Sequence, residues 1–230
     1  MSFPAPLEFS TAPWRLSGVV YGTLLNHQAA LEALGEAVNA APYKGAPRAP
    51  VLYIKPRNTR NVNGGSVPVP ADVEALEVAA SLGIVIGQAA CRVAAADALN
   101  HIAGYTIVAD ISIPHTAVYR PSIRLRARDG FCPIGPSIVP RAAVADPDRL
   151  RVQTFIDGVL QHDSHTGERI RPVAQLLADV TEFMTLLPGD VLLLGSAAGA
   201  PRAGAGQRSR IEIEGLGALE NHFVKEGNKA

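Results

Sequence analysis

Apolar residues along the chain fall into short runs that are separated by turn-forming residues. Runs of this length, bounded by Gly, Pro, Asn and Asp, are typical of β-strands. Residues 150–161 predict a hairpin, with Asp157 and Gly158 as its two-residue turn. A last strand is expected through Leu219, after the turn at 215–217. The other segments predicted as strands are 18–25, 51–54, 82–86, 104–113 and 210–214 (with Ile211 and Ile213 facing inward), and also 190–195.

Three segments have the apolar spacing of helices. One follows Asn26 as a candidate N-cap and runs to about residue 41, and a second covers 93–102. The clearest covers 172–187, with Pro172 near its start and a Pro-Gly pair after its end. The pattern as a whole predicts a mainly β protein with some helix, of the α+β class.

A connector rich in proline, at residues 41–50, is the one plausible boundary in the chain. It divides the sequence into a small α/β lead-in at 1–50, a main domain at 51–224 and a tail at 225–230. The polar, turn-rich segment 57–66 is expected to form a surface loop near a site.

Composition narrows the class of protein. Of the 230 residues, 47% are hydrophobic and 18% are charged, which excludes a disordered chain. The formal net charge is zero, so neither nucleic acid nor an anionic membrane is expected as the main partner. Cys91 and Cys132 are expected to be buried thiols in a reducing compartment. The start of the chain has no signal-peptide pattern, and the default location is the cytoplasm.

Motifs for common chemistries are missing. There is no G-x-S-x-G, no phosphate-binding glycine loop and no zinc-type pairing of cysteines. His162 and His165 are expected in a solvated loop, whereas His115 follows a predicted strand and is better placed for a cleft. Asp110 lies inside an otherwise apolar strand, and a buried carboxylate implies a partner.

The order of several segments resembles the fumarylacetoacetate hydrolase superfamily over nearly all of residues 18–223. This resemblance implies the mixed β-roll fold of the family's C-terminal-like domain. Two further segments resemble the branch of isomerase/decarboxylases in 4-hydroxyphenylacetate breakdown: APYKGAPRAPVLYIKPRNT (41–59) and IPHTAVYRPSIRLRARDGFCPIGP (113–136). The segments that carry the wider resemblance are YIKPRNT (53–59), GIVIGQAACRV (83–93), ADALNHIAGYTIVADIS (96–112), RDGFCPIGPSIVP (128–140), EFMTLLPGDVLLLG (182–195) and IEGLGALEN (213–221).

The resemblance implies a site for Mg²⁺ or Mn²⁺ that is held by three carboxylates, namely a Glu-x-Glu pair and an aspartate. Hard cations of this kind prefer oxygen ligands and chelate 2-oxo acids. Asp110 matches the aspartate, but Ala79 and Ser81 replace the glutamate pair. The ion is therefore expected to bind weakly or not at all. In the branch that the chain resembles, the first half of the bifunctional enzymes also lacks the glutamate pair.

The remaining candidates come from matching positions in the same segments. The resemblance implies catalytic roles for Asp110, Arg126 and Ser196, while Lys55 and His115 are candidates for binding substrate in a cleft. Each also has a plain interpretation, as a satisfied structural carboxylate, an ion-pair group or a surface residue. Two further substrate-binding candidates are Tyr119 and Arg120.

The function that this implies is one subunit of an isomerase/decarboxylase for dienoate di- and tricarboxylates. Two alternatives stay open: a non-catalytic partner of a sister subunit that keeps the glutamate pair, and an acylpyruvate hydrolase-like enzyme. The expected partners are a small-molecule carboxylate substrate and a second subunit, in a homodimer or a hetero-oligomer.

Overall fold

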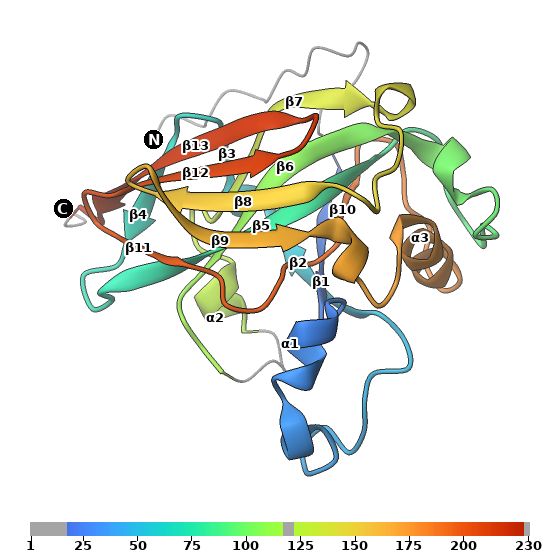
Figure 1. Cartoon of the computed structure of the whole chain (residues 1–230), viewed down its shortest axis with the longest axis horizontal. Helices are drawn as coiled ribbons and strands as arrows, with labels where there is room; N and C mark the ends of the chain where they lie inside the picture. Colours follow the sequence, from blue (N-terminus) through green and yellow to red (C-terminus); the bar gives the residue numbers. More distant parts are fainter. Residues whose placement is uncertain (1–17, 117–121, 228–230) are drawn as a thin grey trace.

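A computed structural model describes residues 18–116 and 122–227 of the chain. Two β-sheets pack against each other, as Figure 1 shows, and short helices lie around them. This is the mainly β, curled architecture that the sequence predicts. None of the helices in the described part is long and apolar enough to cross a bilayer.

The larger sheet has eight strands. Its path runs β2-β1-β10-β5-β6-β7-β3, and β11 pairs with β5 beside that path. The strands are β1 (Val20–Leu24), β2 (Val51–Lys55), β3 (Arg60–Asn61), β5 (Ala75–Ile86), β6 (Ile102–Ser112), β7 (Cys132–Pro140), β10 (Val191–Leu193) and β11 (Arg202–Gly204).

This sheet curls back on itself, because β2 and β3 stand at opposite ends of its path and yet follow each other in the chain. Both faces of its central strands are buried. One face packs on the second sheet, and the other encloses a small core that includes Val85, Val108 and Ile134. Burial on both faces explains why β5 and β6 are nearly continuous apolar runs instead of alternating ones.

The second sheet has five strands in the order β4-β13-β12-β8-β9. The predicted hairpin is confirmed: β8 and β9 pair through Asp157 and Gly158, whose φ angles of 49° and 81° suit a two-residue hairpin turn. The strands are β4 (Ser66–Val69), β8 (Arg151–Ile156), β9 (Val159–His165), β12 (Arg208–Ile213) and β13 (Gly217–Lys225).

The helices are shorter than their patterns predict. They are α1 (Gln28–Glu32), α2 (Ile123–Arg126) and α3 (Val173–Thr181). Single 3₁₀ turns occur elsewhere in the chain, at Gly35–Val38, Arg57–Thr59, Ala98–His101, Arg141–Ala143 and Thr166–Glu168. The helix predicted at 93–102 is wrong, since only its last residues form a 3₁₀ turn. The helix α2 lies in a segment where no helix was predicted.

Asn26 does not cap α1, contrary to expectation, because its side chain has tertiary partners. Its amide donates to the carbonyls of Leu194 and Arg171, and its oxygen accepts from the Arg171 amide. The N-cap is His27, which makes no capping hydrogen bond. Asn26 therefore ties the end of β1 to the segment before α3.

The strand β1, which was predicted to belong to the lead-in, lies inside the large sheet. It pairs with β2 in antiparallel fashion and with β10 in parallel. The expected burial of both thiols holds for Cys132 only, since Cys91 is exposed. His162 and His165, expected in a loop, belong to β9.

Candidate functional site

Asp110 lies on β6, in the middle of the large sheet, with 4% of its surface exposed. On the neighbouring strand β5, Ala79 stands directly opposite Asp110, and Ser81 stands opposite Val108. Side chains of directly opposed residues point to the same face of a sheet. Positions 79, 81 and 110 therefore share one face, as their matching to a common site requires.

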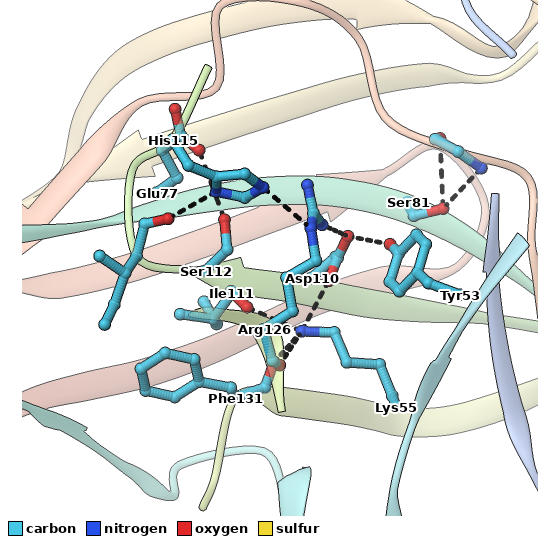
Figure 2. Close-up of polar contacts among 12 residues, drawn as sticks. Tyr53, Lys55, Glu77, Ser81, Asp110, Ile111, Ser112, His115, Arg126 and Phe131 are labelled. Carbon is cyan, nitrogen blue, oxygen red and sulfur yellow. Dashed lines mark hydrogen bonds and ion pairs between the residues drawn. The ribbon is translucent and has the colours of Figure 1, made fainter. Parts of the chain in front are cut away.

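Both oxygens of the Asp110 carboxylate are engaged by side chains from other elements (Figure 2). Lys55 Nζ, at the end of β2, lies 2.7 Å from Oδ1. Arg126 Nη1, at the end of α2, lies 3.2 Å from Oδ2. The hydroxyl of Tyr53, two residues before Lys55 on β2, donates a hydrogen bond to Oδ2.

The electrostatics of this cluster follow from burial and from the two cations. Burial by itself would raise the pKa of Asp110, but Lys55 and Arg126 outweigh it and hold that pKa below its ordinary value. Burial and then the nearby carboxylate raise the pKa of Tyr53 well above its ordinary value. Asp110 is thus ionised and Tyr53 is a neutral donor, so the cluster carries one net positive charge.

Arg126 is fixed on three sides. Its guanidinium lies 4.8 Å from the centre of the Tyr53 ring, within the range of a cation–π interaction. Its Nε donates to His115 Nε2 over 3.3 Å. Because His115 Nδ1 lies 2.8 Å from the carbonyl of Ile113, which only accepts, the proton of the neutral ring sits on Nδ1. Arg126 Nη2 has no hydrogen bond within the part of the chain that the structure describes.

The close approach of Tyr53 depends on a glycine. Gly22 on β1 pairs with Tyr53, and a Cβ atom at Gly22 would fall within 2.0 Å of the Tyr53 ring. Any larger residue would push the ring away from Asp110. Tyr53 was not among the predicted site residues, although its spacing of two from Lys55 along a strand places both side chains on one face.

The other predicted site residues take different positions. Ser81 Oγ is 3.2 Å from both the amide nitrogen and the carbonyl oxygen of Gly195, so its hydroxyl holds the segment that follows β10. Ser196 follows that contact and makes no hydrogen bond to any described residue. Tyr119 and Arg120 lie outside the described residues. The structure therefore brings together Lys55, Asp110, His115 and Arg126.

These residues do not fit a divalent metal ion. Mg²⁺ takes six oxygen ligands in octahedral geometry, of which one or two are usually carboxylates that are free to face the ion. Asp110 is the single carboxylate at the three matching positions, and both of its oxygens face side-chain donors. Glu77, on the same face, accepts a hydrogen bond from Ser112 over 3.3 Å. Within residues 18–116 and 122–227, no three His, Cys, Asp or Glu side chains are arranged to hold a metal.

Comparison of the sequence with models of known protein families identifies the family of this chain. Residues 19–224 match the family described as fumarylacetoacetate (FAA) hydrolase C-terminal. A relative from Escherichia coli, named 4-hydroxyphenylacetate degradation bifunctional isomerase/decarboxylase, is 38% identical over 211 residues. The match covers 92% of this chain and 48% of the relative, so the chain spans about half the length of that protein.

Solved structures agree with this family. The 5-carboxymethyl-2-hydroxymuconate delta-isomerase of Mycobacterium smegmatis has a TM-score of 0.78 and 31% identity, covering 93% of this chain and 81% of that one. The 2-hydroxyhepta-2,4-diene-1,7-dioate isomerase of Mycobacterium marinum has a TM-score of 0.76 and 29% identity, covering 93% and 77%. A fumarylpyruvate hydrolase of Pseudomonas aeruginosa, solved with Mn²⁺ and pyruvate, shares the fold at a TM-score of 0.81 and 22% identity over 98% and 99%.

Proposed function

The chain belongs to the fumarylacetoacetate hydrolase C-terminal family, and from this premise we propose that it is one subunit of an isomerase/decarboxylase in 4-hydroxyphenylacetate catabolism. The proposed reactions are those of 2-hydroxyhepta-2,4-diene-1,7-dioate isomerase and 5-oxopent-3-ene-1,2,5-tricarboxylate decarboxylase. The names of the Escherichia coli relative and of the Mycobacterium marinum structure support this choice. Cys91 and Cys132 are both free thiols, which suits the proposed cytoplasmic location.

The observation that carries the proposal is the fixed guanidinium of Arg126 in a cluster with net positive charge. A guanidinium binds carboxylates strongly, through charge-assisted and often paired hydrogen bonds. Asp110, Tyr53 and His115 hold Arg126 in place before any ligand arrives, which lowers the cost of binding. In this proposal Arg126 binds a carboxylate of the substrate, and its charge stabilises the enolate that isomerisation or decarboxylation produces.

Asp110 has a supporting role in this scheme, since Oδ2 already accepts hydrogen bonds from Tyr53 and Arg126 and Oδ1 forms an ion pair with Lys55. It orients Arg126 and does not itself reach for a proton. His115, with a proton on Nδ1 and Nε2 turned to Arg126, lines the more exposed side of the same cluster. Contacts of the substrate with Ser196, Tyr119 and Arg120 stay predictions.

A second function is favoured by the substitutions at positions 79 and 81. A chain that keeps the fold and the cationic cluster, but lacks two of the three family carboxylates, suits a non-catalytic partner of a sister subunit that keeps its glutamate pair. The proposed assembly is a homodimer or a hetero-oligomer with such a sister. The match to about half of a longer relative is consistent with a partner domain or subunit.

An activity assay separates the two functions. The purified chain, alone and mixed with a sister subunit that has the glutamate pair, is given the dienoate and the tricarboxylate, with and without Mg²⁺. Turnover by the chain alone supports the enzyme, and turnover only in the mixture supports the partner. If the chain itself is the enzyme, Arg126→Ala should reduce its turnover, whereas the matched control Arg124→Ala, an exposed arginine on the same helix, should not.

A further inference from the structure

Lys55 is enclosed by oxygen atoms. Its side chain is fully buried, and Nζ lies 2.7 Å from the carbonyl of Ile111, 2.9 Å from that of Arg126 and 3.0 Å from that of Phe131. A fourth oxygen, Asp110 Oδ1, is 2.7 Å away. Figure 2 shows the ammonium at the meeting point of these groups. An ammonium has three protons, and three backbone carbonyls accept them.

The four oxygens come from three parts of the fold. Ile111 and Asp110 belong to β6, Arg126 ends α2, and Phe131 directly precedes β7. Burying an ammonium costs free energy unless oxygen atoms replace the water that solvates it, and here a carbonyl oxygen accepts each of its three N–H groups. The ammonium also balances the charge of Asp110, and it donates a hydrogen bond to the backbone carbonyl of Arg126, whose guanidinium contacts Asp110 as well. Lys55 therefore holds β6, α2 and the start of β7 around one positive charge.

We propose that Lys55 is the built-in cation of this centre. Its ammonium holds the carboxylate of Asp110 and the backbone carbonyl of Arg126 in place. The centre therefore assembles without a divalent ion and binds anions through the guanidinium of Arg126. Lys55 is thus a positioning residue, and not the cleft residue that binds substrate. This role holds whichever carboxylate the chain binds, and it goes beyond the proposed function because it concerns what assembles the site.

The test removes the side chain and returns its charge as a small molecule. Lys55→Ala deletes the atoms from Cγ to Nζ, which n-propylammonium reproduces. We expect the variant to lose more than about 5 °C in Tm, because Asp110 and three carbonyls lose a partner. We expect n-propylammonium chloride to restore about half or more of that loss, by binding the folded state alone. Sodium chloride at equal ionic strength and n-propanol should not.

Two variants separate charge from packing. Lys55→Met keeps a stem of similar length without the ammonium, and it should lose nearly as much Tm as Lys55→Ala. Lys225→Ala removes an exposed lysine at the end of β13, and it should leave Tm unchanged and insensitive to n-propylammonium. A Lys55→Met variant as stable as the native chain would overturn the proposal, and so would equal effects of n-propylammonium and n-propanol on Lys55→Ala.

A measurement on the native chain decides the matter if neither Lys55 variant folds. Thermal unfolding is followed in EDTA and then in millimolar Mg²⁺ or Mn²⁺. A built-in cation predicts equal Tm values in all three conditions. A rise in Tm with either metal that disappears in Asp110→Asn would mean that the centre uses a divalent ion, and the proposal would be rejected.

Discussion

Asp110 shows how one buried charge organises its surroundings. A carboxylate in the middle of a sheet is unstable without compensation, and here two cations and a phenol provide it. The three groups come from β2 and α2, so the same contacts that satisfy Asp110 also fix the geometry of Arg126. A change at any member is therefore felt by the others, and effects of paired substitutions should not add.

Replacing Arg126 by alanine tests its role as the carboxylate anchor. We expect a dicarboxylate or tricarboxylate ligand to bind more weakly by about 1.5–3 kcal/mol, the range of a hydrogen bond to a charged group. Calorimetric titration of the native chain, Arg126→Ala and the control Arg124→Ala measures this directly. Equal affinities in all three would make Arg126 a structural residue.

The ionisation of Asp110 predicts a dependence of stability on pH. Its pKa is lower in the folded chain than in the unfolded one, where it is about 3.9. Its ionised form therefore stabilises the fold fully above that value, and the contribution is lost as pH falls through the folded pKa. Urea unfolding should show the native chain more stable than Asp110→Asn by about 3–5 kcal/mol at pH 7.

The gap between these two proteins should narrow below about pH 4, because the unfolded native chain then binds a proton at Asp110 while the folded chain still holds this carboxylate ionised. Comparing the two proteins cancels the titration of every other carboxylate. A gap that stays constant from pH 7 to pH 3 would contradict the assignment of a lowered pKa to Asp110.

At the scale of elements, the pairing of β5 with β6 decides what the site can bind. Ala79 opposes Asp110 and Ser81 lies two residues along the same face, so the strand pair already presents the three positions of a carboxylate triad. Only the side chains differ from that triad. At the two positions beside Asp110 the side chains are a methyl group and a hydroxymethyl group instead of carboxylates.

The double substitution Ala79→Glu and Ser81→Glu should therefore create a metal site. We expect it to bind Mn²⁺ roughly tenfold or more tightly than the native chain, because two carboxylates join Asp110 on one face. Titration with Mn²⁺ measures the affinity, and Ala79→Gln with Ser81→Gln is the uncharged control. Micromolar affinity for Mg²⁺ in the native chain would show instead that the matching of this segment is incorrect.

At the scale of the whole molecule, the surface carries apolar side chains at several separate places. Val159 and Leu160 lie on β9, the edge strand of the second sheet, and Ile54 lies on β2, at the end of the large sheet's path. Phe183 and Leu187 follow α3 and are also exposed. Exposed edge strands with apolar side chains are favourable places for pairing with another chain.

We therefore predict association with a second copy or with a sister subunit. Sedimentation of the pure chain at micromolar concentration should show a species larger than the 24.1 kDa monomer. Leu160→Lys, which charges the exposed edge of β9, should weaken any association through that strand, whereas Lys225→Ala should not. A single 24.1 kDa species would leave only the sister subunit as a partner.

The sequence by itself determined most of the strands, the hairpin and the family. Strands that are buried on both faces need apolar residues along nearly their whole length. The turn between β8 and β9 needs residues that accept a positive φ. Both features can therefore be recognised in the local sequence. The order of segments identified the family, and single positions such as Asp110 and Arg126 could be matched within it. The substitutions at 79 and 81 were visible in the same way.

Only the tertiary structure decided the helix lengths and the contacts within the site. Asn26 is a residue type that often caps helices, but carbonyls distant in sequence accept hydrogen bonds from its side chain. At the start of the predicted helix 93–102, the amides of Arg92 and Val93 donate instead to the carbonyl and hydroxyl of Thr181, at the end of α3. Lys55, which was predicted to bind substrate, lies buried against β6, the end of α2 and Phe131. Such partners lie more than fifty residues away, and no local pattern encodes which oxygen atoms a folded chain brings to one ammonium.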